Sequence, residues 1–148
     1  MSPRTLHFED VNEGDRLPAL EKRPELVDVV KWSGATWTFV PIFFDRDLAR
    51  AQGLPDSIIP GPMKFAYLAI LLHRWAGPAA LIRSLRISYR RPDVPRRSLT
   101  LCGLVTGTSL VDGRGLIDLE LWAENDRGER TVAGAATVEL PLAAGDDA

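Results

Sequence analysis

Hydrophobic and polar positions alternate along the second half of the chain. The segment "SLRISYR", residues 84–90, places Leu85, Ile87 and Tyr89 between polar residues, which is the pattern of a strand with one buried face. Three further strand candidates follow: "SLTLCGLVTG", "GLIDLELWAE" and "RTVAGAATVEL". The sequences "VDGRG" and "NDRG" between the last three are typical of hairpin turns. The pattern therefore predicts successive antiparallel strands from about residue 82 onward.

The first half of the chain predicts helices instead. The segment "PELVDVVKWSG", residues 24–34, is a candidate short helix that we expect to end at Gly34. The segment "DRDLARAQGL", residues 45–54, places Asp45 at a helix N-cap and Gly53 where a glycine commonly ends a helix.

The longest predicted helix lies in "PGPMKFAYLAILLHRWAGP", residues 60–78. Its residues are apolar on almost every face, so other structure must surround it. A buried helix followed by antiparallel strands predicts the α+β class, with a curved antiparallel sheet wrapped around one buried central helix. We expect a single domain over residues 1–142 and a flexible C-terminal tail at 143–148.

Composition narrows the functional classes. The 148 residues are 45% hydrophobic, enough for one real core, and the formal net charge of −2 offers no basic field for nucleic acid. The single cysteine, Cys102, excludes an internal disulfide and a cysteine-rich zinc site. The N-terminus lacks the apolar segment of a signal peptide, and "FAYLAILL" is far shorter than the ~20 residues that span a bilayer. We expect a soluble cytoplasmic protein with no nucleic-acid or membrane partner, no metal and no cofactor.

Three segments, in this order, resemble the MaoC-like (R)-specific enoyl-CoA hydratases and acyl dehydratases of the hot-dog superfamily. They are "FEDVNEGDRL" at 8–17, "SGATWTFVPIFFDRDLARAQGL" at 33–54, and "IIPGPMKFAYLAILLHRWAG" at 58–77 with "LIRSLRISYRRPDVP" after it. The resemblance covers most of the chain and implies a hot-dog fold. Such domains usually pair, so it also implies a homodimer or a heteromer with a related chain.

The second segment resembles the part of the hydratases that holds a catalytic Asp/His dyad, which reads roughly Gly-Asp-x-x-Pro-Ile-His-x-Asp. The Pro-Ile step falls on Pro41 and Ile42, which puts Thr38 at the position of the Asp and Phe43 at that of the His. Hydration of an enoyl thioester needs groups that exchange protons near neutral pH, and these two side chains do not. The resemblance therefore implies a hydratase frame without its dyad.

Other site residues follow from the resemblance or from their chemistry. The backbone N–H of Gly61, at the start of the central helix, is the candidate oxyanion donor, although a plain helix start explains the same sequence. Asp45 is a candidate substitute acid–base group, although a helix cap is the favoured interpretation. His7 and His73 are the only imidazoles, and we expect His73 to serve the end of the central helix. We expect Cys102 to be a small buried hydrophobe.

Aromatic and apolar side chains surround the altered dyad positions. We expect an acyl pocket lined by Trp37, Phe39, Phe44 and Met63. The alternative for these aromatics is a hydrophobic contact surface, because aromatic residues are enriched at interfaces.

Four arginines surround a strand end in "YRRPDVPRR": Arg90, Arg91, Arg96 and Arg97. A guanidinium fork suits phosphate oxygens, so this cluster is a candidate for binding the phosphates of coenzyme A. The alternative is a solvated strand edge whose charges discourage edge-to-edge pairing.

The resemblance implies an acyl-thioester-binding subunit that supports a catalytic MaoC-like hydratase in a heteromer acting on a bulky or long acyl-CoA. Two alternatives stay open at this point. One is a stand-alone homodimer that binds acyl-CoA or acyl-carrier thioesters without transforming them. The other is an active hydratase or thioesterase that uses a non-standard group such as Asp45.

Overall fold

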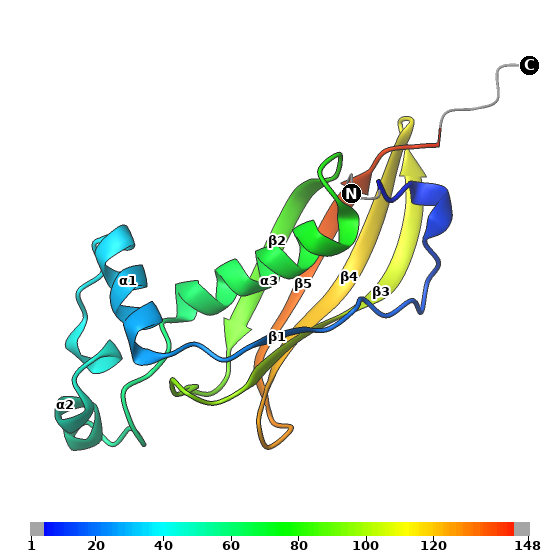
Figure 1. Ribbon diagram of the computed structural model, residues 1–148. Helices are drawn as coiled ribbons and strands as arrows, with labels where there is room; N and C mark the ends of the chain where they lie inside the picture. The colour runs from blue at the N-terminus through cyan, green and yellow to red at the C-terminus, as the bar shows by residue number, and fades with distance from the viewer. Residues whose placement is uncertain (1–4, 144–148) are drawn as a thin grey trace, which may run out of the picture.

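Five strands form one antiparallel sheet in the order β1-β3-β4-β5-β2 (Figure 1). The computed structural model describes residues 5–143, so the predicted tail lies outside the described residues except for Ala143. The strands are β1 (Leu20–Lys22), β2 (Leu81–Tyr89), β3 (Leu99–Val111), β4 (Arg114–Asn125) and β5 (Arg130–Leu140). The four longer strands match the four predicted segments, whereas the short β1, which pairs with β3, was not predicted.

The two predicted hairpins are present, and local chemistry explains them. Asp112 and Gly113 connect β3 to β4 with φ angles of 49° and 73°, as a tight turn that matches the twist of its strands requires. Gly128 has φ 74° in the turn between β4 and β5, where Asn125 N–H donates to the carbonyl of Glu129 at 3.0 Å. These turns fix the register of the sheet's centre.

The predicted central helix is α3 (Gly61–Ala76), which lies along the concave face of the sheet (Figure 1). Its residues Leu68, Leu71 and Leu72 are at most 2% exposed and belong to the main core. Full burial of each such side chain contributes about 1.5–3 kcal/mol. The wrapping is less complete than predicted, since Phe65 and Ile70 are 38% and 37% exposed. The sheet of one chain covers only one side of α3.

The helices α1 (Leu26–Thr36) and α2 (Arg46–Ala51) project beyond one end of the sheet, with the 3-10 turn η2 (Pro41–Phe43) between them (Figure 1). A second hydrophobic cluster packs in this region; it contains Val29, Ile59 and Met63, with Trp32, Phe43 and Tyr67 against it. A further 3-10 turn, η1 (Phe8–Asp10), lies near the start of the described chain.

The predicted end of the first helix at Gly34 is wrong. The helix α1 continues to Thr36, and Trp37 caps it in the left-handed conformation with φ 56°. The Trp37 N–H donates to the carbonyl of Ser33, so the last turn closes two residues beyond the glycine. By contrast, the predicted helix after Asp45 is present, and Gly53 follows it with φ 83°.

Over residues 5–143, no helix combines the length and the apolar character that crossing a bilayer requires.

Candidate functional site

The two residues at the expected dyad positions already have structural roles. Thr38 follows the cap of α1; its N–H donates to the carbonyl of Ser33 at 3.0 Å, and its hydroxyl lies 3.2 Å from the carbonyl oxygen of Thr36. Phe43 ends η2 and packs against the second hydrophobic cluster. One side chain is used at a helix end and the other in packing, and neither is an acid–base group near pH 7.

Asp45 caps α2, as the favoured interpretation of the sequence predicted. Its Oδ1 accepts a hydrogen bond from the N–H of Leu48 at 3.0 Å, and its backbone is extended as an N-cap requires. The capping bond uses one oxygen of this carboxylate, which gives Asp45 a structural role.

Gly61 is the first residue of α3, and its N–H is the only free donor in the first helical turn. Pro62 carries no N–H, while the N–H groups of Met63 and Lys64 both approach the carbonyl of Pro60, at 3.0 and 3.3 Å. No acceptor for Gly61 N–H lies within the described chain. The helix dipole adds to the attraction that this donor has for a negative oxygen.

The ring of Tyr89 explains why position 61 is a glycine. A Cβ added to Gly61 would lie 2.7 Å from Tyr89 Cζ, closer than side chains pack. Tyr89, at the end of β2, therefore lies directly over the Gly61 backbone, and burial raises the pKa of its phenol. The ring fills the space that a side chain at position 61 would take.

A buried ion pair, which the sequence did not predict, stands beside Gly61. Lys64 Nζ lies 2.8 Å from Asp93 Oδ2, and their side chains are only 3% and 5% exposed. The ammonium also donates to the carbonyl of Arg91 at 3.1 Å and lies 5.7 Å from the centre of the Tyr89 ring. The pair connects the start of α3 to the β2–β3 connection. In the sequence, the feature that indicates such a pair is a lysine among the apolar residues at the start of the helix.

The four residues predicted to line an acyl pocket do not line a common one. Trp37 and Phe39 are 84% and 54% exposed and pack edge-to-face on each other, with ring centres 5.3 Å apart. Met63 is buried in the second hydrophobic cluster, and Phe44 lines a surface cavity of about 630 Å³. Trp37 and Phe39 turn outward from the helical end while Met63 turns into it, so an acyl pocket formed by these residues stays a prediction.

The predicted cluster of four arginines is divided between two cavities. Arg96 and Arg97 line the first, of about 690 Å³, whereas Arg90 and Arg91 line a smaller one of about 320 Å³ beside Gly61. The separation follows from the backbone, because the N–H groups of Arg90 and Arg91 both donate to Thr131 on β5. The four arginines therefore lie at two places on the surface, and their role in coenzyme A binding stays a prediction.

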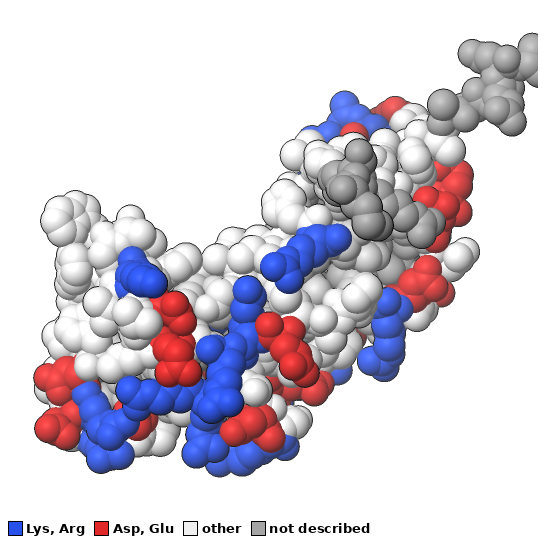
Figure 2. All heavy atoms as spheres, viewed as in Figure 1, with Lys and Arg blue, Asp and Glu red and all other residues white. Residues whose placement is uncertain are grey.

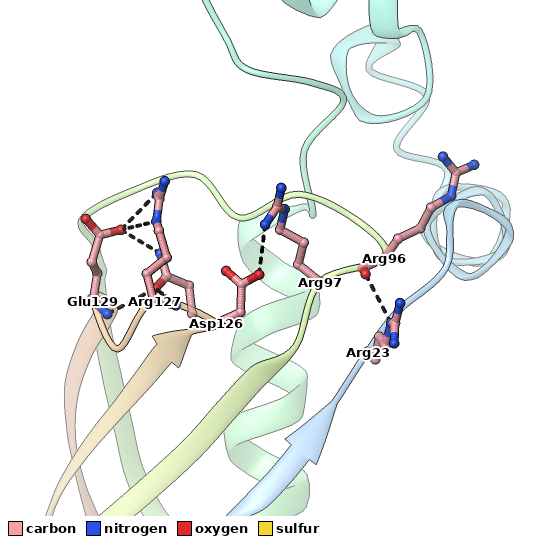
Figure 3. Close-up of polar contacts among 7 residues, drawn as sticks. Arg23, Arg96, Arg97, Asp126, Arg127 and Glu129 are labelled. Carbon is pink, nitrogen blue, oxygen red and sulfur yellow. Dashed lines mark hydrogen bonds and ion pairs between the residues drawn. The ribbon is translucent and has the colours of Figure 1, made fainter.

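The larger cavity gathers arginines that are far apart in the sequence. We call it the arginine cavity and define it by six of its lining residues: Arg23, Arg46, Arg50, Arg96, Arg97 and Arg127. Figure 2 shows Lys and Arg side chains gathered on the lower part of one face. Figure 3 shows Arg97 directed at Asp126 and Arg127 at Glu129, with Arg23 beneath the carbonyl of Arg96. The Arg97–Asp126 contact is 2.9 Å long and the Arg127–Glu129 contact 3.0 Å. Arg23 Nε lies 3.1 Å from the carbonyl oxygen of Arg96.

Asp56 is the carboxylate that holds the α2 side of this cavity. Its Oδ1 lies 3.0 Å from Arg46 Nε and accepts the N–H of Ser57 at 2.7 Å, while Arg50 lies 3.9 Å from its other oxygen. Burial raises the pKa of Asp56, but the Ser57 and Arg46 hydrogen bonds and the two guanidinium charges outweigh it and leave the pKa below its ordinary value.

The remaining singled-out residues do not form a reactive centre. Burial, with the charge of Glu124 second, raises the pKa of the Cys102 thiol, which disfavours the thiolate. His73 is exposed near the C-terminal end of α3. The backbone N–H of His7 donates to Asp10 Oδ2 at 3.1 Å. In the part of the chain that the structure describes, no three His, Cys, Asp or Glu residues gather as metal ligands do.

Comparison with known proteins places this geometry among hydratases. No protein-family model matches the chain. The 3-oxo-4,17-pregnadiene-20-carboxyl-CoA hydratase beta subunit of Mycobacterium tuberculosis (strain ATCC 25618 / H37Rv) is 30% identical over 129 residues, which cover 87% of this chain and 95% of that protein.

Solved structures agree. A chain of the ChsH1-ChsH2 complex from Mycobacterium tuberculosis is 28% identical, with a TM-score of 0.77 over 87% of this chain and 98% of that one. The (R)-hydratase from A. caviae involved in PHA biosynthesis has a TM-score of 0.79 at 22% identity, covering 90% of this chain and 99% of its own. The MaoC-like dehydratase from Rhodospirillum rubrum has a TM-score of 0.82 at 21% identity, covering 94% and 99%. The last two likenesses concern the fold, which is the predicted hot-dog fold.

Proposed function

Since the chain belongs to the MaoC-like hydratase family of hot-dog proteins, we propose that it is a subunit without a catalytic dyad of its own. It assembles with a catalytic MaoC-like hydratase and supports the hydration of an acyl-CoA thioester. The observation that carries this proposal is the use of Thr38 at a helix end and of Phe43 in packing. In the frame of a hydratase, these are the positions where proton transfer would be performed.

The similarity to a beta subunit supports a heteromer. The M. tuberculosis relative is named as one subunit of a hydratase, and the 28% identical structure is a complex of two named proteins. The name of the relative also describes a large carboxyl-CoA substrate. We extend both features to this chain and expect a bulky acyl group.

Two uncovered surfaces of the chain suit a partner subunit. The strand β2, nine residues long, is an edge of the sheet, and no described strand pairs with its outer side. Long edge strands in natural proteins are normally blocked or paired. The uncovered side of α3, with Phe65 and Ile70, is apolar as well. A second hot-dog chain that extends the sheet at β2 and covers α3 satisfies both surfaces.

A chain without a dyad can still take part in binding the thioester. Gly61 retains a free N–H at the start of α3, and Arg90 and Arg91 line the cavity beside it. Arg96 and Arg97, which we also assign to coenzyme A binding, line the separate arginine cavity. The chain thereby supplies polar contacts to the substrate while the partner supplies the Asp and the His.

The test restores the dyad. Purified wild-type chain should not hydrate 2-enoyl-CoA, whereas the double variant Thr38→Asp/Phe43→His should gain measurable hydration. The matched control is Thr38→Asp/Phe39→His. It places the imidazole at the exposed position 39 in place of position 43, and it should remain inactive. Thermal unfolding of each variant identifies any that has lost its fold. Turnover by the wild type that survives Phe43→Ala would show that the catalytic group lies elsewhere and would overturn the proposal.

The oligomeric state separates the leading proposal from a stand-alone homodimer. A chain that is a stable dimer by itself, binds acyl-CoA and shows no exchange with a catalytic hydratase subunit would favour the homodimer. Activity that appears only when the two subunits are mixed supports the heteromer.

A further inference from the structure

We propose that the buried ion pair of Lys64 and Asp93 positions the thioester of the substrate. The pair holds together the two walls of the cavity of about 320 Å³ beside Gly61, which we call the Gly61 cavity, so that the Gly61 N–H stays free for the thioester carbonyl. This inference rests on the proposed function, which assigns that N–H to the thioester. Lys64 and Asp93 are positioning residues, because they act through the backbone of Gly61.

The Gly61 cavity has two walls, and each wall is one short segment of the chain. Four of its lining residues come from residues 58–64 and the other four from residues 89–92. Much of both segments lies outside helices and strands, since residues 58–60 precede α3 and residues 90–92 follow β2. Regular secondary structure therefore does not by itself fix the separation of the walls.

Three hydrogen bonds join the two segments, and Lys64 or Asp93 takes part in each of them. Lys64 Nζ donates to Asp93 Oδ2 at 2.8 Å and to the carbonyl of Arg91 at 3.1 Å. The N–H of Ile59 donates to the carbonyl of Asp93 at 2.8 Å. Ile59 lies before Gly61 in the sequence and Lys64 after it, so the bonds hold the chain on both sides of the free N–H.

Burial distinguishes this ion pair from the others. The side chains of Lys64 and Asp93 are 3% and 5% exposed, whereas both side chains are at least 24% exposed in every other ion pair within residues 5–143. A buried ion pair contributes little net stability relative to apolar residues of similar volume. Stability alone therefore does not explain the pair. What it supplies is one fixed arrangement of the two walls.

That arrangement determines the surroundings of the Gly61 N–H. No acceptor for this N–H lies within the described chain. The ring of Tyr89, from the opposite wall, lies against the Gly61 backbone, where an added Cβ would come within 2.7 Å of Tyr89 Cζ. Lys64 Nζ lies 5.7 Å from the centre of the same ring, a distance at which an ammonium attracts an aromatic face. The pair therefore orients both the donor and the ring beside it.

The test compares an acyl-CoA with an analogue that lacks the carbonyl oxygen. Octanoyl-CoA carries the thioester carbonyl, and the thioether S-octyl-CoA has a CH₂ group in its place. Calorimetry with the full wild-type chain should show that octanoyl-CoA binds about fivefold more tightly, the value of one hydrogen bond. The ratio of the two Kd values isolates the carbonyl contact, because the other contacts are common to both ligands.

The variant Lys64→Met/Asp93→Leu replaces the ion pair by apolar side chains. It should keep a cooperative melting transition and bind S-octyl-CoA as the wild type does, but it should lose the preference for octanoyl-CoA. A merely structural role would lower both affinities together and leave their ratio unchanged. A folded double variant that keeps the wild-type preference would overturn the inference.

The matched control is Arg130→Met/Glu120→Leu. It makes the same kind of exchange at an exposed ion pair between β5 and β4, whose charged atoms also lie 2.8 Å apart. The control should keep the preference for octanoyl-CoA, and an equal loss in the control would overturn the inference.

A second variant, Asp93→Asn, tests the same point if the double variant does not fold. Its amide oxygen still accepts a hydrogen bond from Lys64 Nζ, but the bond is weaker because the acceptor carries no charge. The preference for octanoyl-CoA should therefore fall below that of the wild type. A folded Asp93→Asn chain with the full preference would overturn the inference.

Failure of this inference and failure of the proposed function give different results. A wild-type chain that binds neither ligand, alone or mixed with a catalytic hydratase subunit, would contradict the proposed function itself. A wild-type chain that binds both ligands equally retains a role in coenzyme A binding but makes no contact with the carbonyl, which overturns the inference. A variant without the ion pair that keeps the preference overturns the inference alone.

Discussion

At the scale of single residues, the buried charges near the start of α3 are fully paired, in contrast to the neighbouring Gly61 N–H. The Lys64–Asp93 pair is buried, and both partners make further contacts: the ammonium with the carbonyl of Arg91, and the Asp93 carbonyl with Ile59 N–H at 2.8 Å. Such a pair adds little net stability over apolar residues, but the loss of one partner leaves an uncompensated buried charge. Its main effect is to fix the β2–β3 connection against α3.

This pairing predicts an asymmetric response to mutation. Lys64→Met should lower the free energy of unfolding by about 3–5 kcal/mol, because Asp93 then remains buried without a counter-charge. The double variant Lys64→Met/Asp93→Leu should recover most of the loss. Urea unfolding of the two variants and the wild type measures both values. A nearly neutral Lys64→Met would mean that the carboxylate reaches water, contrary to its burial.

Asp56 predicts part of the acid sensitivity of the protein. Its folded pKa lies below the ordinary value of 3.8, so its contribution to stability is present above that value and is lost as the pH falls through the lower, folded pKa. Asp56→Asn should therefore flatten the loss of stability below about pH 4 relative to the wild type. Urea unfolding from pH 2.5 to 6 checks this. Parallel curves for the two proteins would contradict the Arg46 and Arg50 contacts.

At the scale of elements, α3 has one side against the sheet and one side uncovered. Leu71 is 2% exposed within the main core, while Ile70, the preceding residue, is 37% exposed. The same helix therefore contributes to the core of the chain on one side and, under the proposal above, offers its other side to a partner subunit.

The contrast gives a matched pair of substitutions. Leu71→Ala should cost about 2–5 kcal/mol, because it removes buried atoms and leaves a cavity. Ile70→Ala should cost less than about 1 kcal/mol in the isolated chain at low concentration. Urea unfolding at two protein concentrations measures the difference. An equally large, concentration-independent cost for Ile70→Ala would contradict the uncovered face.

Local patterns explain which elements were predictable. Asp112-Gly113 and the alternation around Ile87 act over a few residues, so the hairpin and its strands follow from the sequence. The end of α1 was not predictable, because Trp37 adopts a left-handed cap that glycine usually provides. Strand β1 is too short to show a period and exists through its pairing with β3.

The candidate site was less predictable than the fold, because its residues meet through contacts between parts of the chain that are distant in the sequence. Arg96 and Arg97 were visible as a local cluster, but Arg23 and Arg127 join them only through the tertiary fold. Lys64 was hidden in an apolar helix because its partner, Asp93, lies 29 residues away. Asp45 was predictable as a cap because the bond that it accepts spans only three residues.

At the scale of the whole molecule, the chain combines a hydratase fold with an open sheet edge, and Thr38 and Phe43 stand where the resemblance places the dyad. The family relation comes from the 30% identical hydratase subunit, and the fold from structures with TM-scores of 0.77 to 0.82. The dyad positions, the nine-residue edge of β2 and the uncovered side of α3 lead to the same proposal. Under this proposal, catalysis belongs to a partner, and this chain contributes structure and binding.

The most direct test is the turnover of 2-enoyl-CoA by the purified wild-type chain alone, with an intact MaoC-like hydratase assayed in parallel as the active reference. We predict no hydration above the uncatalysed rate, with short or long acyl chains, because neither Thr38 nor Phe43 transfers a proton near pH 7. Hydration at a rate comparable to the reference enzyme would contradict the proposal that this chain is a subunit without its own catalytic centre.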